Sequence, residues 1–323
     1  MNIVFMGTPD FAVPVLEMLL QEGYPVTAVV SQPDRPKGRK KVLTPPPVKE
    51  AALRHGLPVL QPERIRRSEA VEAIAGLQPD LIVTAAYGQI VPKAILELPK
   101  HGCINVHASL LPKYRGGAPI QHAILNGEAV TGVTIMYMAE GLDTGDMLAK
   151  VEVPITDEDT GGTLFDKLSE AGADLLRRTL PDLLVGKLTA VPQAHEEATL
   201  APNIKREDEW IRWERPAMEL FNQIRGLNPH PGAFTTWNGD VLKIWAARKP
   251  KPASVPQGAV PGTVIGTGDD YIEVATGDGA LRVTELQPAG KKAMSAAQLL
   301  RGTSVPAGTV LGERADAGTD GRR

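Results

Sequence analysis

Short apolar runs and stretches of helical periodicity alternate along the first 190 residues. Apolar runs predict strands, and apolar positions spaced by three and four residues predict helices. The predicted strands are residues 2–6, 26–30, 58–60, 80–84, 103–106, 133–138 and 147–153, and the predicted helices are 11–20, 48–55, 69–77, 92–96, 118–125 and 162–184. This alternation predicts an α/β fold, with a Rossmann-like, mostly parallel sheet covered by helices on both faces.

The pattern changes after residue 190. Few apolar pairs occur at 190–210, and one further helix is predicted at 217–225. Short alternating runs, separated by Gly, Pro, Asn and Asp, then favour a small antiparallel barrel or sandwich; they lie at 232–237, 241–246, 262–267, 271–275 and 281–286. We therefore expect an α/β domain over 1–190, a linker over 191–207, a smaller β-rich, OB-like barrel over 208–311, and a disordered tail over 312–323.

Composition narrows the class of protein. The 323 residues are 42% hydrophobic and 23% charged, which is an ordinary globular balance and excludes a generic disordered chain. No apolar run approaches the ~18–20 residues of a membrane span. Asp10 and Glu17 interrupt the apolar stretch near the N-terminus, so we expect no secretory signal and a cytoplasmic protein. The single cysteine, Cys103, excludes an intrachain disulfide.

The densest candidate chemistry lies in residues 103–112, where a predicted strand ends. Open α/β sheets bind ligands at the carboxyl ends of their strands. Asn105 and His107 are two residues apart, so on an extended chain they point to the same side. An amide and an imidazole that face one crevice can hydrogen-bond a developing oxyanion. Such side chains also satisfy loop backbone, and spacing alone does not decide between the two roles.

Asp143 lies in a turn between two predicted strands, 36 residues beyond His107. A carboxylate beside a histidine favours the protonated ring and fixes its orientation. Only the fold can bring the two together, and an ordinary Asp-rich turn is the simpler explanation from sequence alone. Ser109 lacks the G-x-S-x-G setting of a serine hydrolase, and His107 with Asp143 lacks a third metal ligand. The turn after the first strand lacks G-x-G-x-x-G, which argues against nicotinamide binding.

Five of the seven residues from Arg35 to Lys41 are basic, although the net charge of the chain is −3. The prolines at 45–47 follow, and we expect a flexible loop outside helix and sheet. Such a loop suits contact with a phosphate backbone. A solvated charge run has the same composition. The loop follows the second predicted strand, which places it at the same sheet edge as His107 and favours a polyanion partner.

These segments resemble a known family. The run Asn105-x-His107-x-Ser109-Leu110-Leu111-Pro112, with residues 114–121 after it, is similar to the formyltransferase folate signature. Gly132-Val133-Thr134 and Gly141-Leu142-Asp143-Thr144-Gly145 resemble the next block of that signature. Within this folate-dependent superfamily, residues 6–11, 31–35 and 228–232 resemble the methionyl-tRNA formyltransferases, and the resemblance covers nearly the whole chain.

The resemblance implies an enzyme of translation initiation that transfers the formyl group of 10-formyltetrahydrofolate to the amino group of methionyl initiator tRNA. It implies that the catalytic residues are Asn105, His107 and Asp143. It implies that the folate is contacted by Ser109, Leu110, Leu111, Pro112, Val83, Tyr87 and Gly88. It implies that the acceptor stem is bound through Arg35, Lys37, Arg39, Lys40 and Lys41, and that the barrel domain binds tRNA. We expect a monomer without metal, membrane or protein partner.

The chemistry of these residues fits direct transfer. An α-amine has a pKa near about 8, so a useful fraction is a neutral nucleophile at cellular pH. Its attack on the formyl carbon creates an oxyanion that Asn105 and His107 are expected to stabilise, while Asp143 orients His107 and helps to remove the ammonium proton. Alternatives are a formyltransferase for an amino-sugar nucleotide or a purine precursor, and a non-catalytic RNA-binding module. The basic loop and the second domain favour tRNA over the first two, and the intact trio argues against the third.

Overall fold

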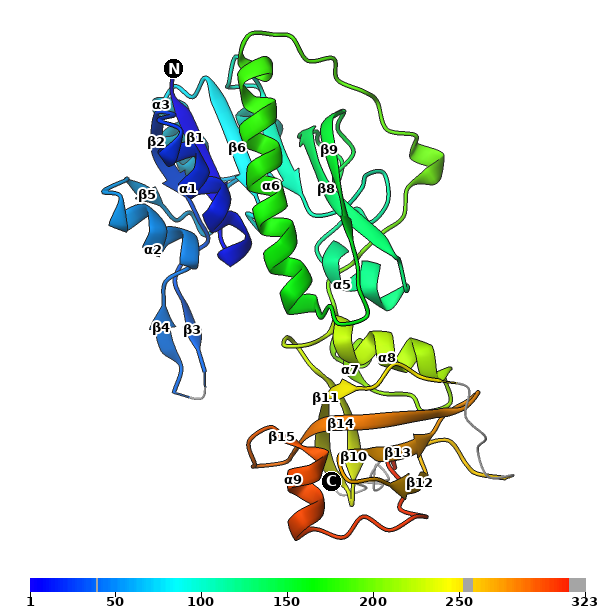
Figure 1. Ribbon diagram of the computed structural model, residues 1–323. Coiled ribbons are helices and arrows are strands. Elements are labelled where there is room, and N and C mark those ends of the chain that lie inside the picture. Colours follow the sequence, from blue (N-terminus) through cyan, green and yellow to red (C-terminus); the bar gives the residue numbers. More distant parts are fainter. Residues whose placement is uncertain (39, 252–257, 314–323) are drawn as a thin grey trace, which may run out of the picture. The chain divides into compact units, whose positions relative to one another are not determined.

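The chain divides into two compact units in a computed structural model that describes residues 1–38, 40–251 and 258–313. Unit 1 consists of Met1–Pro119, Val130–Pro154 and Phe165–Asn203. Unit 2 consists of Ile120–Ala129, Ile155–Leu164 and the described residues from Ile204 onward. Each unit has its own sheet (Figure 1). The two units are therefore described separately.

Unit 1 is built on a sheet with the strand order β5-β2-β1-β6-β7-β8-β9. Pairing is parallel from β5 to β7, and β8 and β9 pair antiparallel at one end. The strands are β1 Ile3–Gly7, β2 Val26–Val30, β5 Val59–Leu60, β6 Leu81–Ala85, β7 Cys103–His107, β8 Val130–Tyr137 and β9 Met147–Pro154. The predicted Rossmann-like, mostly parallel sheet is confirmed.

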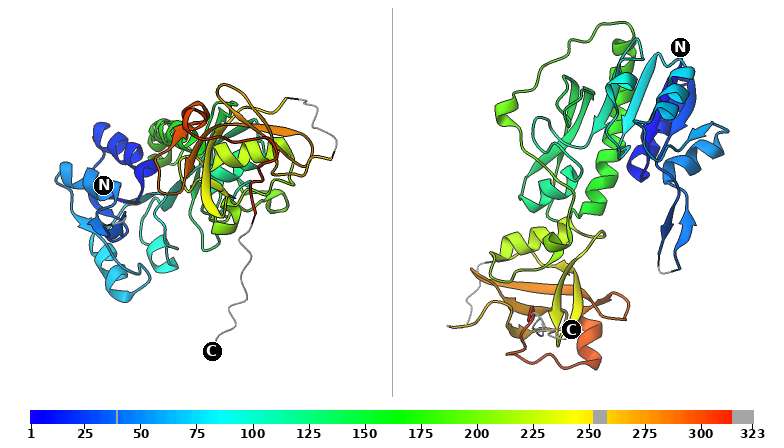
Figure 2. Two further views of the ribbon diagram at one scale, coloured as in Figure 1. Left: turned by 90° about the horizontal axis from the view of Figure 1, so that it is seen from below. Right: turned by 180° about the vertical axis from the view of Figure 1, so that it is seen from behind.

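Helices lie on both faces of this sheet, as Figures 1 and 2 show from opposite sides. Ile74 and Ile95, on α3 and α4, pack with Met6, Ile82 and Cys103 on one face. The long helix α6 covers the other face. The helices of unit 1 are α1 Val13–Gln21, α2 Pro47–Arg54, α3 Ser68–Gly76, α4 Lys93–Leu96 and, from Phe165 on, α6 Gly161–Leu184, with short 3-10 turns at Asp10–Ala12 and His195–Glu197.

A glycine lets α6 lie close to the sheet. A Cβ atom added to Gly172 would be 2.8 Å from a methyl carbon of Val106 on β7 and 3.5 Å from one of Val133 on β8. Real Cβ atoms essentially never approach that closely. The separation between α6 and the strand that carries Asn105 and His107 therefore depends on the missing side chain at position 172.

The prediction of a flexible loop over residues 35–41 is wrong. This segment forms a two-stranded antiparallel hairpin of β3 (Arg35–Lys37) and β4 (Val42–Thr44). Pro36 pairs opposite Leu43, which a two-stranded ribbon tolerates because a proline without an N–H can take a position that donates no ladder bond. Gly38 (φ 70°) and Lys41 (φ 49°) supply the left-handed conformations that reverse the chain.

Unit 2 contains an antiparallel sheet, which confirms the predicted β-rich second domain. Its strand order is β10-β11-β14-β13-β12, with β15 paired to β14. The strands are β10 Ala233–Trp237, β11 Asp240–Ala247, β12 Val264–Thr267, β13 Ile272–Ala275, β14 Ala280–Pro288 and β15 Met294–Ser295. The helices are α5 Pro119–Leu125, in this unit from Ile120, α7 Arg206–Glu209, α8 Ala217–Gly226 and α9 Ala296–Gly302. The sequence pattern did not predict α7, β15 or α9.

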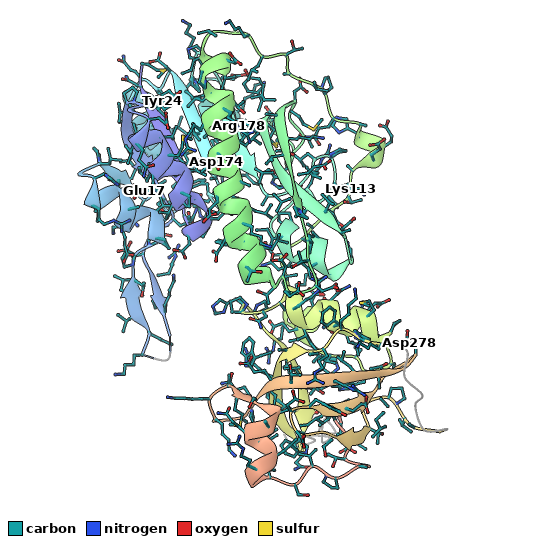
Figure 3. All side chains as sticks on the ribbon, in the orientation of Figure 1. Glu17, Tyr24, Lys113, Asp174, Arg178 and Asp278 are labelled. Carbon is teal, nitrogen blue, oxygen red and sulfur yellow. The ribbon has the colours of Figure 1, made fainter. Side chains whose placement is uncertain are left out.

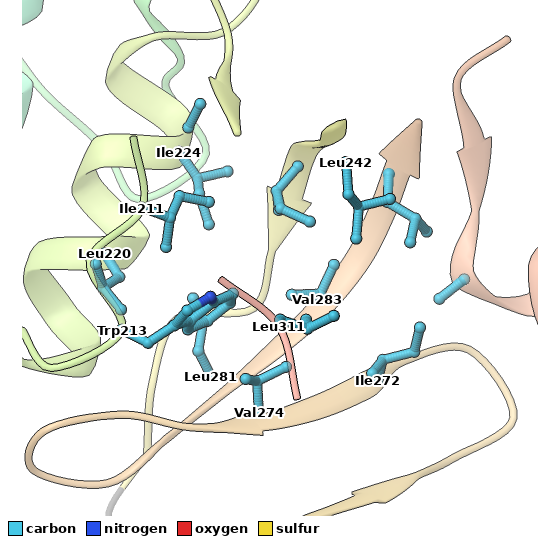
Figure 4. Packing of buried hydrophobic residues seen from close by; sticks show 14 of the residues in the cluster. Ile211, Trp213, Leu220, Ile224, Leu242, Ile272, Val274, Leu281, Val283 and Leu311 are labelled. Carbon is cyan, nitrogen blue, oxygen red and sulfur yellow. The ribbon is translucent and has the colours of Figure 1, made fainter. Parts of the chain in front are cut away.

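The core of unit 2 forms between its sheet and α8. Trp213 and Leu220 pack with Leu281 and Leu311, and Ile224 belongs to the same buried cluster (Figure 4). The turn between β13 and β14 binds the N-terminus of α8, because the Ala217 N–H donates to the carboxylate of Asp278 (2.7 Å), a residue labelled in Figure 3.

The end of the described chain joins the two outer strands of this sheet. Val264 donates to Thr309 O (2.7 Å) beside β12, and Gly312 donates to Thr236 O (2.9 Å) beside β10. Backbone hydrogen bonds therefore cover part of each sheet edge. Of the predicted tail at 312–323, residues 314–323 lie outside the described residues. No helix among the described residues is both long and apolar enough to span a membrane.

Replacing Gly172 with Val is expected to lower the free energy of unfolding by about 1–3 kcal/mol, because the new side chain must displace Val106 or α6. Urea denaturation followed by circular dichroism measures the change. Gly76→Val is the matched control, since Gly76 is also helical and nothing lies within 4 Å of its added Cβ. We expect the control to lose less than about 1 kcal/mol. Equal losses in the two variants would contradict the close packing of α6.

Candidate active site

Asn105 and His107 stand at the carboxyl end of β7. They alternate along the strand with Val106, which faces α6. They therefore share the face of Cys103, whose side chain packs in the buried cluster with α3 and α4. Burial raises the pKa of the Cys103 thiol to about 12, so it carries almost no thiolate near neutral pH. Cys103 is a core residue rather than a nucleophile.

One side of the Asn105 amide is in contact with β6. Its Oδ1 lies 2.8 Å from Thr84 Oγ1, and the same hydroxyl lies 2.9 Å from Ile104 O. A hydroxyl has a single hydrogen, so Thr84 donates to one of these oxygens at a time. Within the described part of the chain, no acceptor is paired with Asn105 Nδ2. The half-buried amide therefore retains N–H groups that a bound oxygen can accept from.

The ring of His107 is fixed from one side. Its Nε2 lies 3.0 Å from Tyr114 O, and because a carbonyl only accepts, Nε2 carries a hydrogen. Its Nδ1 lies 3.8 Å from Asp143 Oδ2, a separation within ion-pair range but too long for a hydrogen bond. The two side chains are 6% and 16% exposed. Nδ1 is thus the ring atom left for chemistry.

Asp143 reaches this position from the loop between β8 and β9. The register pairs His107 with Thr134 but Ile104 with Tyr137, so the loop begins at the opposite end of β7. Three strand residues span about 10 Å, and the loop must fold back over that distance. The Gly116 N–H holds the carboxylate by donating to Asp143 Oδ2 at 2.8 Å.

The loop after β7 is held by buried hydrogen bonds. Thr134 Oγ1 donates to Ser109 O (2.7 Å) and accepts from Leu111 N–H (3.1 Å). Ser109 Oγ donates to the carbonyl of Lys113 (2.6 Å), a residue labelled in Figure 3, and Lys150 Nζ donates to Leu111 O. Leu110 and Pro112 are half-buried. The candidate folate segment 109–112 is therefore a fixed loop, and the Ser109 hydroxyl is engaged with a backbone carbonyl.

The remaining candidate folate residues lie in β6 and directly after it. Val83 is fully buried in that strand. Tyr87 is 4% exposed and belongs to the core cluster, where burial raises its pKa to about 12. Its carbonyl accepts from Thr8 Oγ1 (2.8 Å) and Gln32 Nε2 (3.2 Å). Gly88 has φ 93°. Val83 and Tyr87 thus bury their side chains. Val83 pairs with Ile104, three residues before His107, whereas Tyr87 and Gly88 follow the carboxyl end of β6.

The candidate tRNA residues lie on the β3–β4 hairpin. Arg35 forms an ion pair with Glu63 (Nη2 to Oε2, 2.6 Å). Lys37, Lys40 and Lys41 are exposed, and no ion pair joins them to another described residue. Arg39 lies outside the described residues. Three of the five predicted cations are therefore free to bind an external anion.

The sequence did not single out several residues of this site. Thr84 is a buried polar position within an apolar strand, and that pattern alone could have marked it. Thr134 and Arg115 lie inside the quoted motifs but had no assigned role. Gln193 lies in the predicted linker, where nothing in the neighbouring sequence distinguishes it. No group of three or more potential metal ligands occurs among the residues that the structure describes.

Two family models match this chain, and together they include residues of both units. The family model for formyl transferase matches residues 1–180, and that for formyl transferase, C-terminal domain, matches residues 203–304. The methionyl-tRNA formyltransferase of Bacillus subtilis (strain 168) is 61% identical over 312 residues, which are 96% of this chain and 98% of that protein. The methionyl-tRNA formyltransferase of Halalkalibacterium halodurans is 59% identical over 315 residues, 97% of this chain and 98% of that protein.

Solved structures share the fold at lower identity. HypX from Aquifex aeolicus in complex with tetrahydrofolic acid has a TM-score of 0.62 and 19% identity, over 92% of this chain and 46% of that chain. An N-formyltransferase from Helicobacter canadensis, with folinic acid and dTDP-3-aminofucose, has a TM-score of 0.61 and 19% identity, over 88% of this chain and 98% of that chain.

Replacing Thr134 with Val is expected to lower the free energy of unfolding by about 1–3 kcal/mol, because Ser109 O and Leu111 N–H lose their common partner inside the protein. Chemical denaturation measures the loss. The control is Thr179→Val on α6, where the buried hydroxyl donates only to Leu175 O, a carbonyl that the helix already pairs. We expect the control to change stability by less than about 1 kcal/mol. A Thr134 variant as stable as wild type would show that the loop does not depend on this hydroxyl.

Proposed function

This chain belongs to the formyl transferase family, and on that premise we propose that it transfers the formyl group of 10-formyltetrahydrofolate to the amino group of methionyl initiator tRNA. Relatives about 60% identical over nearly their whole length carry the name methionyl-tRNA formyltransferase. The observation that most supports the chemistry is the 3.8 Å separation of His107 Nδ1 and Asp143 Oδ2 beside Asn105. These three side chains are proposed as the catalytic residues.

Asn105 and His107 act as the oxyanion donors in this proposal. When the methionyl amine attacks the formyl carbon, Asn105 Nδ2 and His107 Nδ1 donate to the oxygen that gains negative charge. Two properties of the site support this role: Nδ2 has no acceptor among the described residues, and His107 Nε2 is already committed to Tyr114 O. A positioned donor of this kind contributes roughly 3–4 kcal/mol to lowering the barrier.

Asp143 faces the reacting side of the His107 ring. At 3.8 Å its carboxylate lies within ion-pair range of Nδ1 but is too far away to accept a hydrogen bond from it. Nδ1 therefore remains available to the substrate oxygen. Asp143 also accepts the proton that the attacking amine loses, through a water molecule, and that proton passes to N10 of the folate as the bond between the formyl carbon and N10 breaks.

The transfer is direct in this proposal, with no acyl-enzyme. The pKa of the buried Cys103 thiol, about 12, argues against a thiolate nucleophile. The Ser109 hydroxyl is committed to the carbonyl of Lys113. The loop 109–112 and the segment 83–88 are proposed to line the folate site, largely through their backbone.

The hairpin is the proposed contact for the tRNA acceptor stem, and unit 2 is proposed to bind tRNA as well. Lys37, Lys40 and Lys41 are exposed cations without an ion-pair partner in the described chain, which suits them to phosphate oxygens. Arg39 is proposed from sequence alone. Arg35 can contribute only if its ion pair with Glu63 opens.

One incubation tests the proposed function. The purified protein is mixed with 10-formyltetrahydrofolate and methionyl initiator tRNA. The ester bond is then hydrolysed with alkali, and the released formylmethionine is measured. A parallel incubation replaces the tRNA with an amino-sugar nucleotide. Formylation of the tRNA ester supports the proposal. Formylation of the sugar amine alone would overturn it in favour of a sugar formyltransferase.

Replacing His107 with Ala is expected to lower kcat by about 10²–10³-fold, because one oxyanion donor and the partner of Asp143 are lost. The fold should remain, as judged by circular dichroism. His101→Ala, in the turn before β7, is the matched control and should keep wild-type turnover. Near-normal turnover in the His107 variant would remove its catalytic assignment.

Replacing Lys37 and Lys41 together with Ala is expected to raise the KM for methionyl-tRNA and to lower the slope of log affinity against log salt by about 2, because two phosphate contacts are lost. Affinity for the folate should not change. Lys100→Ala with Lys187→Ala, two exposed lysines of unit 1 outside the hairpin, is the control and should leave the salt slope unchanged. Loss of folate binding in the hairpin variant would instead indicate a structural role.

A further inference from the structure

Gln193 joins the Asp143 loop to a buried arginine. Its side chain is 5% exposed and lies in the segment that follows α6 and passes beside β9 (Figure 1), where Val191 and Met147 exchange backbone hydrogen bonds of 2.8 Å. Gln193 Nε2 donates to Asp143 O (2.8 Å) and to Gly145 O (2.7 Å).

The other end of the same amide is equally engaged. Gln193 Oε1 accepts from Arg115 Nε (3.0 Å) and Arg115 Nη2 (2.6 Å). An amide side chain has two N–H donors and two lone pairs on its oxygen, so every hydrogen-bonding position of Gln193 is used. The amide has one possible orientation, because a flip would set its oxygen against two carbonyls and its NH₂ against a guanidinium.

Arg115 is a buried cation held by neutral groups. Across the described ranges, no carboxylate oxygen lies within ion-pair distance of its guanidinium, although the side chain is buried. Besides Gln193, Arg115 Nη2 contacts His195 Nδ1 (3.0 Å), and this nitrogen must act as the acceptor because a guanidinium only donates. Without Gln193 Oε1, the guanidinium would lose two of these three hydrogen bonds, which is costly for a buried charge.

Asp143 depends on support from outside its own loop. Its φ of 50° is a left-handed conformation that a residue with a side chain adopts infrequently. The loop starts at the end of β8 that pairs with Ile104, yet it returns the carboxylate to His107. The contacts that hold Asp143 there are the Gly116 N–H on its carboxylate and Gln193 Nε2 on its carbonyl.

Both of these contacts are connected to Arg115. Gly116 follows Arg115 directly in the chain, and Arg115 donates two hydrogen bonds to Gln193 Oε1. The carboxylate and the backbone of Asp143 are thus both held by residues adjacent to, or bound to, one guanidinium. Gln193 lies between the two segments that match family models, residues 1–180 and 203–304.

We propose that Gln193, which is hydrogen-bonded to Arg115, is a positioning residue that keeps the Asp143 carboxylate beside His107 for formyl transfer. This inference rests on the proposed function, because it assigns Gln193 a role through the proposed catalytic Asp143. Gln193 acts on the conformation of the loop at 141–146 and touches neither substrate.

Gln193→Glu tests the donor role of the side chain separately from its acceptor role. The carboxylate still pairs with Arg115, so the buried cation keeps its partner, but both donors to Asp143 O and Gly145 O are lost. We expect kcat to fall at least tenfold and the KM of each substrate to stay within twofold. We also expect faster amide hydrogen exchange in residues 141–146. Gln193→Met, which removes the two donors and also the acceptor of Arg115, is the second variant if the Glu variant does not fold, and its effect is measured in the same two backgrounds.

A matched control exists in unit 2. Gln223 is a buried glutamine whose Nε2 also donates to two backbone carbonyls, those of Asp208 (2.8 Å) and Trp210 (3.0 Å). Gln223→Met removes the same pair of donors without touching the Asp143 loop. We expect this control to lower the melting temperature while kcat stays within twofold of wild type.

A double-mutant cycle distinguishes positioning from general loss of structure. If Gln193 acts through the Asp143 carboxylate, then Gln193→Glu changes the single-turnover rate less than twofold in an Asp143→Asn background, because the group being positioned is already gone. A purely structural role predicts the same tenfold loss in both backgrounds. Excess enzyme in single-turnover conditions keeps the slow rates measurable.

The proposal is overturned if a folded Gln193→Glu enzyme keeps kcat within twofold of wild type, or if its loss is equal in the two backgrounds. Unchanged exchange at 141–146 also overturns it. Failure of the proposed function is distinct, because the wild-type enzyme would then not formylate methionyl-tRNA. The exchange comparison needs no substrate and still tests whether Gln193 holds the loop.

Discussion

A polar group that is taken out of water must find a partner inside the protein, because an unpaired one costs about 1–3 kcal/mol. At the end of β7 this requirement determines the local structure. Thr134 serves two backbone groups of the loop at 109–111, Tyr114 O binds His107 Nε2, and Gln193 uses its whole amide. At this strand end Asn105 Nδ2 has no acceptor among the described residues, so it is able to bind a substrate oxygen.

Features that depend on local periodicity could be predicted from the sequence. The alternating elements of both units agree with the predicted ranges, most of them within one or two residues. The shared face of Asn105 and His107 follows from the two-residue repeat of an extended strand. Asp143 differs, because its approach to His107 depends on a long loop folding back across β7, and no spacing rule encodes that path. Only the family resemblance pointed to it.

The remaining errors have physical causes. The β3–β4 hairpin buries neither face, since Val42 and Leu43 are exposed, so it lacks the apolar alternation by which strands are recognised. The role of Gln193 could not be predicted from the sequence, for a different reason. A glutamine in a polar segment is ordinary, and its importance arises only from carbonyls contributed by a loop 50 residues earlier in the chain. Contacts of this range belong to the tertiary structure and leave no trace in a local pattern.

The interleaving of the two units along the chain affects how they can be separated. Residues 155–164 belong to unit 2, where Arg225 Nη1 donates to Thr156 O (2.7 Å) and Gly162 donates to Asn228 O (2.9 Å). No single scission near residue 204 therefore yields two self-sufficient fragments, because the N-terminal piece would carry two segments stripped of their neighbours. On the ribosome, those same segments emerge early and stay unsatisfied until the chain beyond residue 204 has been synthesised.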